Sequence, residues 1–541
     1  MVVKCGIRNI IYGIICLICS IMFIFPKMEV HAANQSYYID AENGDDSNSG
    51  LTPETAWKTL QKVNHTTFSA GDSILFKSGC TWTGQLYPRG SGTNEAPIVI
   101  DMYGGDQKPI IQANGQKHNT VYLQNQQYWE INNLEITNTA TTVGDYRGIG
   151  IAGKNAGELH HIYIRNCYIH DVSGEVRWIG GSTDNDKTGI YHAAGFDASK
   201  RTGAVIFEVL DPGEDAKATW FENIRVEDCI IKDCSFGGVV TKQWIGNEGW
   251  GERTSFDDAN WVPHQNVYVR NNYIEAVNNP YVCTAIYLTD VRSSTVEGNV
   301  ISNAGCSGIE FYYSDSVLCQ KNEVFGTSKN CTSADYCGID ADKSTTNITI
   351  QYNYSHGNGD GILLCQTGIG GTATVRYNVL QNNSRFSINM HSAVTASADI
   401  YNNTVYGNKK NGKLCGSSGG IKQLNTKGTF RVYNNIFYAA QSGMLIQDGT
   451  KVTYSNNCYY NVDAPTEDTN AVVEDPKFIN PGTGTSGSSS GWAYESLTGY
   501  QLQADSPCID KGTIVENPGE TDFWGNLLYY NGCDIGAYEK P

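Results

Sequence analysis

Short segments of alternating apolar and polar residues recur along the middle of the chain. Typical examples are "GIEFY" (308–312) and "GIDAD" (338–342), each beginning with a small residue. In a β-strand, successive side chains point to opposite faces, so the second residue of each segment faces inward and the third and fifth face outward. The pattern predicts many short β-strands, each with one face in a core.

A recurring turn position separates these segments. An Asn recurs at spacings of 22 to 32 residues, at Asn272, Asn299, Asn322, Asn353, Asn378, Asn403, Asn435 and Asn457. A minimum repeat length with variable additions is typical of a solenoid, in which each repeat is one coil and loops are added freely. We therefore predict an all-β protein, a right-handed parallel β-helix of about 10–12 coils, in which the Asn side chains stack at one turn.

One strand of each coil is flanked by insertions on both sides, and we call it the floor strand. The floor strands are predicted at "GIYHA" (189), "GVVTK" (238), "AIYLT" (285), "GIEFY" (308), "GIDAD" (338), "GILLC" (361), "SINMH" (387), "GIKQL" (420) and "GMLIQ" (443). The insertions carry Trp178, Trp220, Trp244, Trp250 and Trp261. Insertions on one face of a solenoid usually form its binding surface, so the floor strands and these loops predict a groove.

Three carboxylates meet on this floor. Glu310 and Asp340 hold the same outward position on successive floor strands, and Asp342 stands two residues beyond Asp340. Like charges on neighbouring strands are destabilising, and at least one such pKa is expected to rise. A glycoside hydrolase requires this arrangement, because one carboxyl must be protonated and the other ionised. The alternatives are a calcium site, since clustered oxygens suit a hard cation, and incidental surface charge.

The stereochemistry of the reaction depends on which two carboxylates are catalytic. Glu310 with Asp340 would be about 5 Å apart, the separation of retaining enzymes, whereas Glu310 with Asp342 would be about 8 Å apart, which suits inversion. The sequence leaves both open. Asp360, just before the next floor strand, and Asp315, in a turn after one, are secondary catalytic candidates.

Outward or flanking positions on the same floor supply the candidate substrate-binding residues. Aromatic rings are expected to stack on sugars and polar groups to bind hydroxyls. These candidates are Tyr287, Tyr312, His391, Asn389, Trp244 and Lys242.

Composition and charge limit the partners. The chain has 541 residues with a formal net charge of −18, which excludes a nucleic-acid partner because phosphate binding needs a basic face. A polyanionic glycan would be repelled unless a cation bridged it. No cofactor is required, although Ca²⁺ has weak candidate ligands in Asp45, Asp46 and Asn48 of "NGDDSNSG" (43–50).

The first residues predict secretion. Residues 1–32 begin with two basic residues, Lys4 and Arg8, followed by an apolar run and small residues at a cleavage spacing, which is typical of a signal peptide. We expect a secreted, extracellular monomer without membrane association after cleavage. The predicted divisions are 33–130 for an N-terminal cap and first coils, 131–460 for the β-helix with its groove, and 461–541 for the last coils and cap. Secretion permits disulfides, for which Cys508–Cys533 and Cys331–Cys337 are the candidates.

Both ends of the chain resemble a known group. "YYIDAENGDDSNSGLTPETAWKTLQKVN" (37–64), "GDSILFKSG" (71–79) and "GNLLYYNGCDIGAYE" (525–539) resemble the caps of secreted right-handed parallel β-helix proteins. The "GIDAD…QYNYSHGN" stretch is similar to the acidic region of β-helix glycoside hydrolases, particularly glycoside hydrolase families 141 and 120. The resemblance implies action on xylan, xylosides or fucosides by paired carboxylates on adjacent coils. A calcium-assisted polysaccharide lyase and a non-catalytic glycan-binding adhesin are the alternatives.

Overall fold

The structure is a computed structural model of the chain. It describes residues 34–174, 201–214, 216–245, 249–275, 284–327, 336–391, 396–409, 412–416, 429–446 and 452–541. The predicted signal peptide and the predicted floor strands at 189 and 420 lie outside these residues, as do Trp178 and Cys331.

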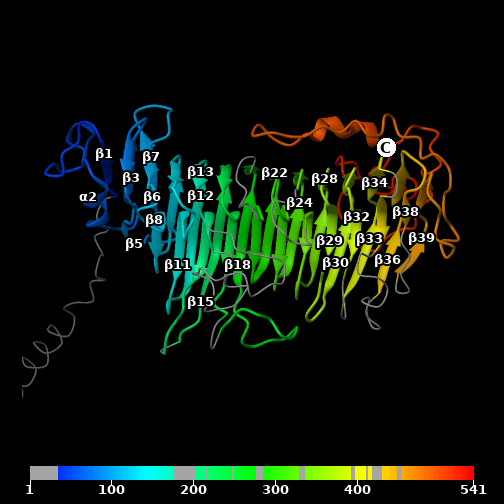
Figure 1. Cartoon of the computed structure of the whole chain (residues 1–541), viewed down its shortest axis with the longest axis horizontal. Coiled ribbons are helices and arrows are strands. Elements are labelled where there is room, and N and C mark those ends of the chain that lie inside the picture. The colour runs from blue at the N-terminus through cyan, green and yellow to red at the C-terminus, as the bar shows by residue number, and fades with distance from the viewer. Residues whose placement is uncertain are drawn as a thin grey trace, which may run out of the picture.

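The described residues form a long solenoid of three parallel sheets that run side by side along the molecule (Figure 1). Each coil visits the three sheets in turn, and each strand pairs with the equivalent strand of the next coil. The fold is the right-handed parallel β-helix that the repeat predicts. The chain alternates inward apolar and outward polar residues in these strands, so Ile, Val and Leu fill a continuous core.

The largest sheet precedes the Asn turn and has fourteen strands. They are β1 (Ser36–Ile39), β3 (Ser73–Lys77), β6 (Ile98–Tyr103), β9 (Trp129–Asn132), β12 (Gly157–Arg165), β15 (Thr219–Glu227), β18 (His264–Arg270), β21 (Val291–Glu297), β24 (Asp315–Gln320), β27 (Ile348–Gln351), β30 (Thr372–Arg376), β33 (Ser397–Tyr401), β36 (Phe430–Tyr433) and β39 (Val452–Ser455).

The second sheet follows the Asn turn and has thirteen strands. They are β4 (Thr81–Thr83), β7 (Ile110–Gln112), β10 (Glu135–Asn138), β13 (Tyr168–Val172), β16 (Ile230–Cys234), β19 (Tyr273–Glu275), β22 (Val300–Ser302), β25 (Glu323–Phe325), β28 (Tyr354–His356), β31 (Val379–Gln381), β34 (Thr404–Gly407), β37 (Ile436–Ala439) and β40 (Cys458–Tyr460).

The third sheet contains the floor strands and is called the floor sheet. Its eleven strands are β8 (Asn119–Gln124), β11 (Arg147–Gly153), β14 (Gly203–Val209), β17 (Gly237–Lys242), β20 (Ile286–Thr289), β23 (Ile309–Tyr312), β26 (Cys337–Ala341), β29 (Asp360–Leu364), β32 (Phe386–Met390), β35 (Lys413–Gly416) and β38 (Leu445–Ile446). A small pair, β2 (Thr67–Phe68) with β5 (Arg89–Gly90), the helix α2 (Leu60–Asn64) and two 3₁₀ helices, Pro53–Thr55 and Tyr494–Tyr500, complete the described elements.

Two coils differ from the sequence prediction in the place of their floor strand. The sheet receives β14 and β35 from these coils, rather than the segments predicted at 189 and 420. The prediction required a small residue followed by an apolar one. "KLCG" lacks that pair, whereas "GAVIFEV" contains it at Ala204 and Val205 but was not chosen for its coil. The strand counts also exceed the predicted 10–12 coils in two sheets, because residues 36–130 add strands without an Asn at their turns.

The predicted Asn stack is confirmed between the first two sheets. Each Asn side chain accepts hydrogen bonds from the preceding Asn and donates Nδ2–H to the next, from Asn272 to Asn457, at Nδ2–Oδ1 distances of 2.9–3.0 Å. The amide of Asn457 donates to the Asp468 carboxylate at 2.9 Å, which ends the row. All these side chains are buried, so the ladder satisfies polar groups that would otherwise be costly.

The last 81 residues, called the C-terminal segment (residues 461–541), fold back along the solenoid over its C-terminal half (Figure 1). The buried Glu323 carboxylate holds this segment, because it accepts hydrogen bonds from the backbone N–H groups of Gly487 (2.7 Å) and Ala493 (2.6 Å). His356 also contacts Glu323 through Nε2 at 3.0 Å.

The C-terminal segment should become less stable as the pH rises. Burial, and then the negative charge of Asp534, raise the pKa of Glu539 from its ordinary 4.5 to about 7. An unfolded Glu539 therefore ionises at a lower pH than the folded one, and its stabilising contribution is lost as the pH rises from 4.5 to 7. We expect a higher melting temperature at pH 5.5 than at pH 8.

Glu539→Gln is the matching control. It stays neutral at both pH values, so the difference in melting temperature should shrink in this variant. Asp522 and Asp534, whose pKa values burial also raises, should leave a smaller residual difference. An unchanged pH difference in Glu539→Gln would contradict the assignment.

The predicted disulfide between Cys508 and Cys533 is wrong. Both cysteines are buried and free in the structure. The Cys533 sulfur instead accepts a hydrogen bond from Asn434 Nδ2 at 3.4 Å, and the Cys508 thiol interacts with Cys458. Cys337 is also free, and its predicted partner lies outside the described residues.

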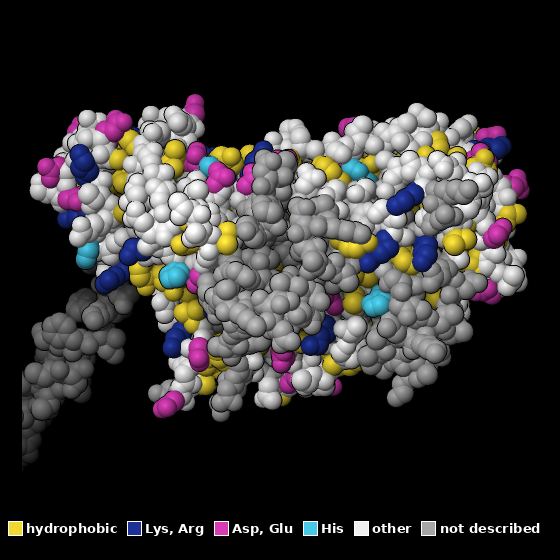
Figure 2. Space-filling model, viewed as in Figure 1, with side chains coloured by type: hydrophobic (Ala, Val, Ile, Leu, Met, Phe, Trp, Pro, Cys, Tyr) yellow, Lys and Arg dark blue, Asp and Glu magenta, His cyan; other side chains and the backbone are white. Residues whose placement is uncertain are grey.

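Surface charge is mixed. Basic and acidic side chains are interspersed over the described part of the face in Figure 2. Among the described residues, no helix has the length and apolar composition needed to span a bilayer.

Candidate active site on the floor sheet

Glu310 and Asp340 are adjacent on the floor sheet. They pair directly between β23 and β26, so the two carboxylates project from neighbouring strands, whose spacing is about 4.8 Å. Both are buried, with exposed fractions of 4% and 0%. The Thr284 hydroxyl donates a hydrogen bond to Glu310 Oε2 at 3.0 Å. The predicted juxtaposition of these two acids is therefore present in the structure.

A thiol connects this pair to the next coil. Cys337 Sγ lies 3.7 Å from Asp340 Oδ2, and Cys337 pairs in register with Asp360 of β29. Burial and then the charge of Asp340 raise the pKa of the Cys337 thiol well above its ordinary value. The thiol therefore stays protonated and serves Asp340 as a weak hydrogen-bond donor.

Asp360 begins its floor strand and holds an ion pair. Its carboxylate accepts both Nε–H (2.7 Å) and Nη2–H of Arg385, the backbone N–H of Phe386 (3.0 Å), and Nδ2–H of Asn389 (2.7 Å). Burial alone would lower the pKa of Arg385, but its hydrogen bond to Asp360 and the charge of that residue raise it. These four donors occupy the Asp360 carboxylate, so it suits positioning of Arg385 and Asn389.

The other two predicted acids have different settings. Asp342 directly follows β26, is half-buried, and accepts a hydrogen bond from the backbone N–H of Lys343 at 2.6 Å. Asp315 begins β24 in another sheet, where its carboxylate accepts from Thr346 and Asn347 and pairs with Arg253 (3.7 Å) and Arg292 (3.4 Å). The structure thus keeps Asp342 beside the pair and uses Asp315 to anchor a loop.

The two predicted tyrosines lie next to the acids. Tyr287 pairs in register with Glu310, and Tyr312 pairs with Thr289 two positions further along the strands. Their ring centres are 6.3 Å apart. Tyr287 is fully buried and Lys242 Nζ lies 5.5 Å from its ring centre, so this tyrosine is a packing residue of the floor. Tyr312 keeps 9% of its surface exposed.

The remaining predicted binding residues are spread along the floor. Asn389 lies one strand beyond Leu363, which separates it from Asp340, and its amide is held by Asp360. His391 follows β32 and is half-buried; burial, and then the charge of Arg385, lower its pKa. Trp244 follows β17 and packs against the main hydrophobic core, so core packing explains it.

Sequence reasoning missed the basic residues of the floor. Arg385 lies directly before β32, so the alternation of inward and outward residues within the strands gave it no position on the floor. Upstream, the buried Glu208 of β14 pairs with Arg147 (3.4 Å) and with Arg201 (2.7 Å), and it lies beside Lys242 in register. Correct placement of the β14 strand would have revealed this second charged cluster.

The weak calcium candidates Asp45, Asp46 and Asn48 make hydrogen bonds within the protein. Asp45 Oδ1 accepts from the N–H and hydroxyl of Ser47. Asp46 accepts from the N–H groups of Lys58 and Thr59, and Asn48 donates to the Ala56 carbonyl. Within the described ranges, no group of three or more His, Cys, Asp or Glu side chains is arranged to hold a metal ion. The bonds between Asp45 and Ser47 form a turn, whereas Asp46 holds residues 12 and 13 positions further along the chain.

Comparisons with known proteins agree on the fold. The family model "Right handed beta helix region" matches residues 263–405. The lacto-N-biosidase of Bifidobacterium longum subsp. longum is 26% identical in an alignment that covers 94% of this chain and 36% of that protein. The chain thus spans about a third of the length of this curated relative. The α-1,3-galactosidase A of Akkermansia muciniphila is 32% identical over 14% of this chain and 12% of that protein.

A solved structure gives the same result. The GH136 lacto-N-biosidase of Eubacterium ramulus superposes with a TM-score of 0.56 at 22% identity, over 78% of this chain and 68% of that chain. The protein is a right-handed parallel β-helix whose sequence similarity is to carbohydrate-active enzymes.

Proposed function

We propose that this protein is a glycoside hydrolase in which Glu310 and Asp340 cleave the glycosidic bond. The observation that carries the proposal is the in-register pairing of these two buried carboxylates on adjacent floor strands. Two buried carboxyl groups at this spacing do not both ionise readily, so one keeps its proton. A protonated and an ionised carboxyl are the two groups that glycoside hydrolysis needs.

The geometry favours a retaining reaction. A strand spacing of about 4.8 Å is close to the roughly 5–5.5 Å that separates the two carboxyls of retaining enzymes. The protonated carboxyl gives its proton to the leaving oxygen while the ionised one bonds to the anomeric carbon. Water then attacks the anomeric carbon, and the first carboxyl takes a proton from that water as the bond between the sugar and the enzyme breaks. Asp342 beside the pair is the alternative partner, and its use would invert the anomeric centre.

The substrate we propose is a neutral glycan. The overall charge of −18 repels polyanionic chains. The relatives are named for lacto-N-biosides and α-1,3-galactosides, so a terminal lacto-N-bioside is the first substrate to test. Xylosides and fucosides, to which the likeness to families 141 and 120 points, are next.

A panel of chromogenic substrates tests this proposal. The purified chain is incubated with p-nitrophenyl β-lacto-N-bioside, β-xyloside, α-fucoside and α-galactoside, and with xylan and pectate. We expect release of nitrophenol from at least one aryl glycoside, with an initial product of unchanged anomeric configuration by NMR. Unsaturated products absorbing in the ultraviolet would instead indicate a lyase, and binding without any released sugar would indicate an adhesin.

A further inference from the structure

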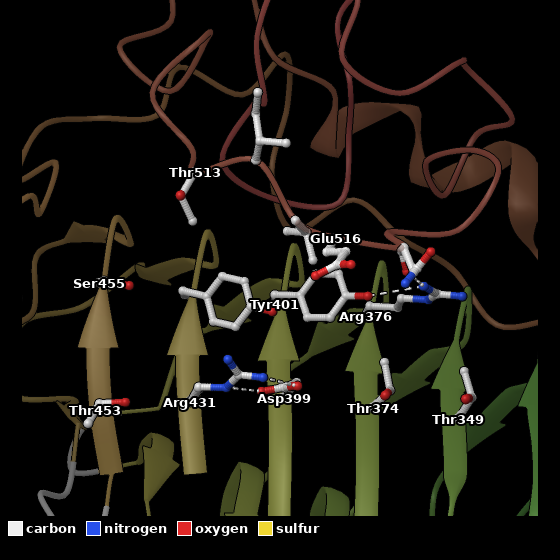
Figure 3. Close-up of a pocket in the computed structure, with 14 residues that line it drawn as sticks. Thr349, Thr374, Arg376, Asp399, Tyr401, Arg431, Thr453, Ser455, Thr513 and Glu516 are labelled. Carbon is white, nitrogen blue, oxygen red and sulfur yellow. Dashed lines mark hydrogen bonds and ion pairs between the residues drawn. The ribbon is translucent and has the colours of Figure 1, made fainter. Parts of the chain in front are cut away.

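A cavity lies on a different sheet from the candidate active site. It occupies about 640 Å³ between the outer face of the largest sheet, at β27 to β39, and residues 513–517 of the C-terminal segment (Figure 3). This volume is in the usual range for small-molecule sites.

Two registered rows of outward side chains on this sheet underlie the cavity, and all of them except Gln351 line it. One row runs Thr349, Thr374, Asp399, Arg431 and Thr453 across consecutive strands. The parallel row, two residues further along each strand, runs Gln351, Arg376, Tyr401, Tyr433 and Ser455. Five strands at about 4.8 Å spacing give a platform roughly 19 Å long.

The roof over this platform is fixed at several points. Asn434 makes two hydrogen bonds with Thr513, one to its carbonyl and one from its N–H, each of 2.8 Å. Arg376 Nη1 donates to the Asn517 carbonyl at 3.1 Å, and the N–H of Val515 donates to the Tyr529 hydroxyl at 3.1 Å. The cavity is therefore preformed, which lowers the entropy that binding would cost.

Charge balance in the cavity indicates a neutral ligand. Two guanidinium groups, of Arg376 and Arg431, face two carboxylates, of Asp399 and Glu516. Arg431 and Asp399 form a two-point ion pair at 2.5 Å, and Figure 3 shows the pair lying across neighbouring strands. Such a pair offers donors and acceptors side by side, as the vicinal hydroxyls of a sugar require. A net anionic or cationic ligand would find no excess of opposite charge.

An aromatic surface adjoins these polar groups. The Tyr433 ring is half-buried and stacks on Tyr401 with ring centres 5.1 Å apart and an angle of 17°. A tyrosine ring fixed this way presents an apolar face with little loss of side-chain entropy. On the other side of Arg376, a second cavity of about 650 Å³ contains Trp492, Tyr494 and Trp524.

We propose that this cavity is a non-catalytic binding site for a neutral oligosaccharide, separate from the floor sheet. The sugar would lie along the strand rows, with hydroxyls on the Asp399–Arg431 pair and one ring against Tyr433. The site would hold a glycan chain on the enzyme independently of cleavage. The proposal does not depend on hydrolytic activity.

The test is binding to an array of neutral, sialylated and uronate-containing oligosaccharides. The experiment uses the full chain with the substitution Glu310→Gln, so that bound sugar is not cleaved. We expect binding to at least one neutral oligosaccharide, and at least about tenfold weaker binding in the Arg431→Ala and Tyr433→Ala variants. Arg431 is largely exposed, so its replacement should leave the fold intact even if Tyr433→Ala lowers the melting temperature.

Tyr438→Ala is the matched control. Tyr438 is a half-buried, stacked tyrosine on the following strand, β37, and does not line the cavity. The Tyr438→Ala variant should bind the array as tightly as the chain that carries Glu310→Gln alone. Absence of binding to every neutral oligosaccharide, binding only to acidic ones, or unchanged binding in Arg431→Ala and Tyr433→Ala would each overturn the proposal.

Discussion

Glu310→Gln and Asp340→Asn should each lower the rate of glycoside hydrolysis by roughly 10³-fold, since an essential acid or base contributes about 10²–10⁴-fold. Each substitution keeps the shape of the side chain and removes its ability to donate or accept a proton. The two residues act as one unit, so the double variant should be little worse than either single one. The measurement is the initial rate on whichever aryl glycoside the wild-type chain cleaves.

Glu297→Gln is the control for the Glu310 change. Glu297 is on β21 in the largest sheet and pairs with Lys321 at 3.6 Å, away from the floor. Its activity should equal that of the wild type, and circular dichroism should show the same β-sheet content in all variants. Near-normal rates in both Glu310→Gln and Asp340→Asn would exclude them as the catalytic pair. Loss of activity in Asp342→Asn, with Asp340→Asn active, would assign the reaction to the inverting alternative.

Asn353→Ala should lower the free energy of unfolding by roughly 3 kcal/mol or more, because a buried group left without its partner costs about 1–3 kcal/mol. The Asn353 amide bonds Asn322, Asn378 and the Cys319 carbonyl, all in the buried ladder. Its removal leaves hydrogen-bonding groups without their partner on the coils before and after it. In a solenoid, stability depends on the interfaces between neighbouring coils, so a break in the middle of the ladder weakens both interfaces.

Denaturation by urea, followed by circular dichroism, measures this effect. Asn94→Ala is the control, because Asn94 is exposed and bonds only the adjacent Glu95 side chain among its described side-chain contacts. We expect an unchanged midpoint for Asn94→Ala and a clearly lower one for Asn353→Ala. Equal midpoints for the two variants would mean that the ladder does not contribute to the stability of the coils.

The repeat made most of the fold predictable. A buried Asn at each turn fixes the phase of the coil, and strand alternation then assigns the faces, so the pairing of Glu310 with Asp340 followed from counting residues. The floor strand before β17 was predicted at "GIYHA" (189) rather than at β14, so Glu208 and its arginine partners were missed. Arg385 was missed because it precedes its strand, and its long side chain reaches Asp360 on the neighbouring coil. The saturation of Asp360 by four donors depends on such contacts between coils, which spacing alone does not encode.

The end of the Asn ladder also bears on self-association. Each coil presents its donors and acceptors to the next, so an uncovered last coil would be a template for another copy of the chain. Here the Asp468 carboxylate accepts the N–H and Nδ2–H of Asn457, and Val472 pairs with the last strand through the N–H of Tyr459 and the carbonyl of Asn457. The residues after the last coil thus terminate the polar row with a negative charge, which opposes end-to-end polymerisation of the solenoid into fibres.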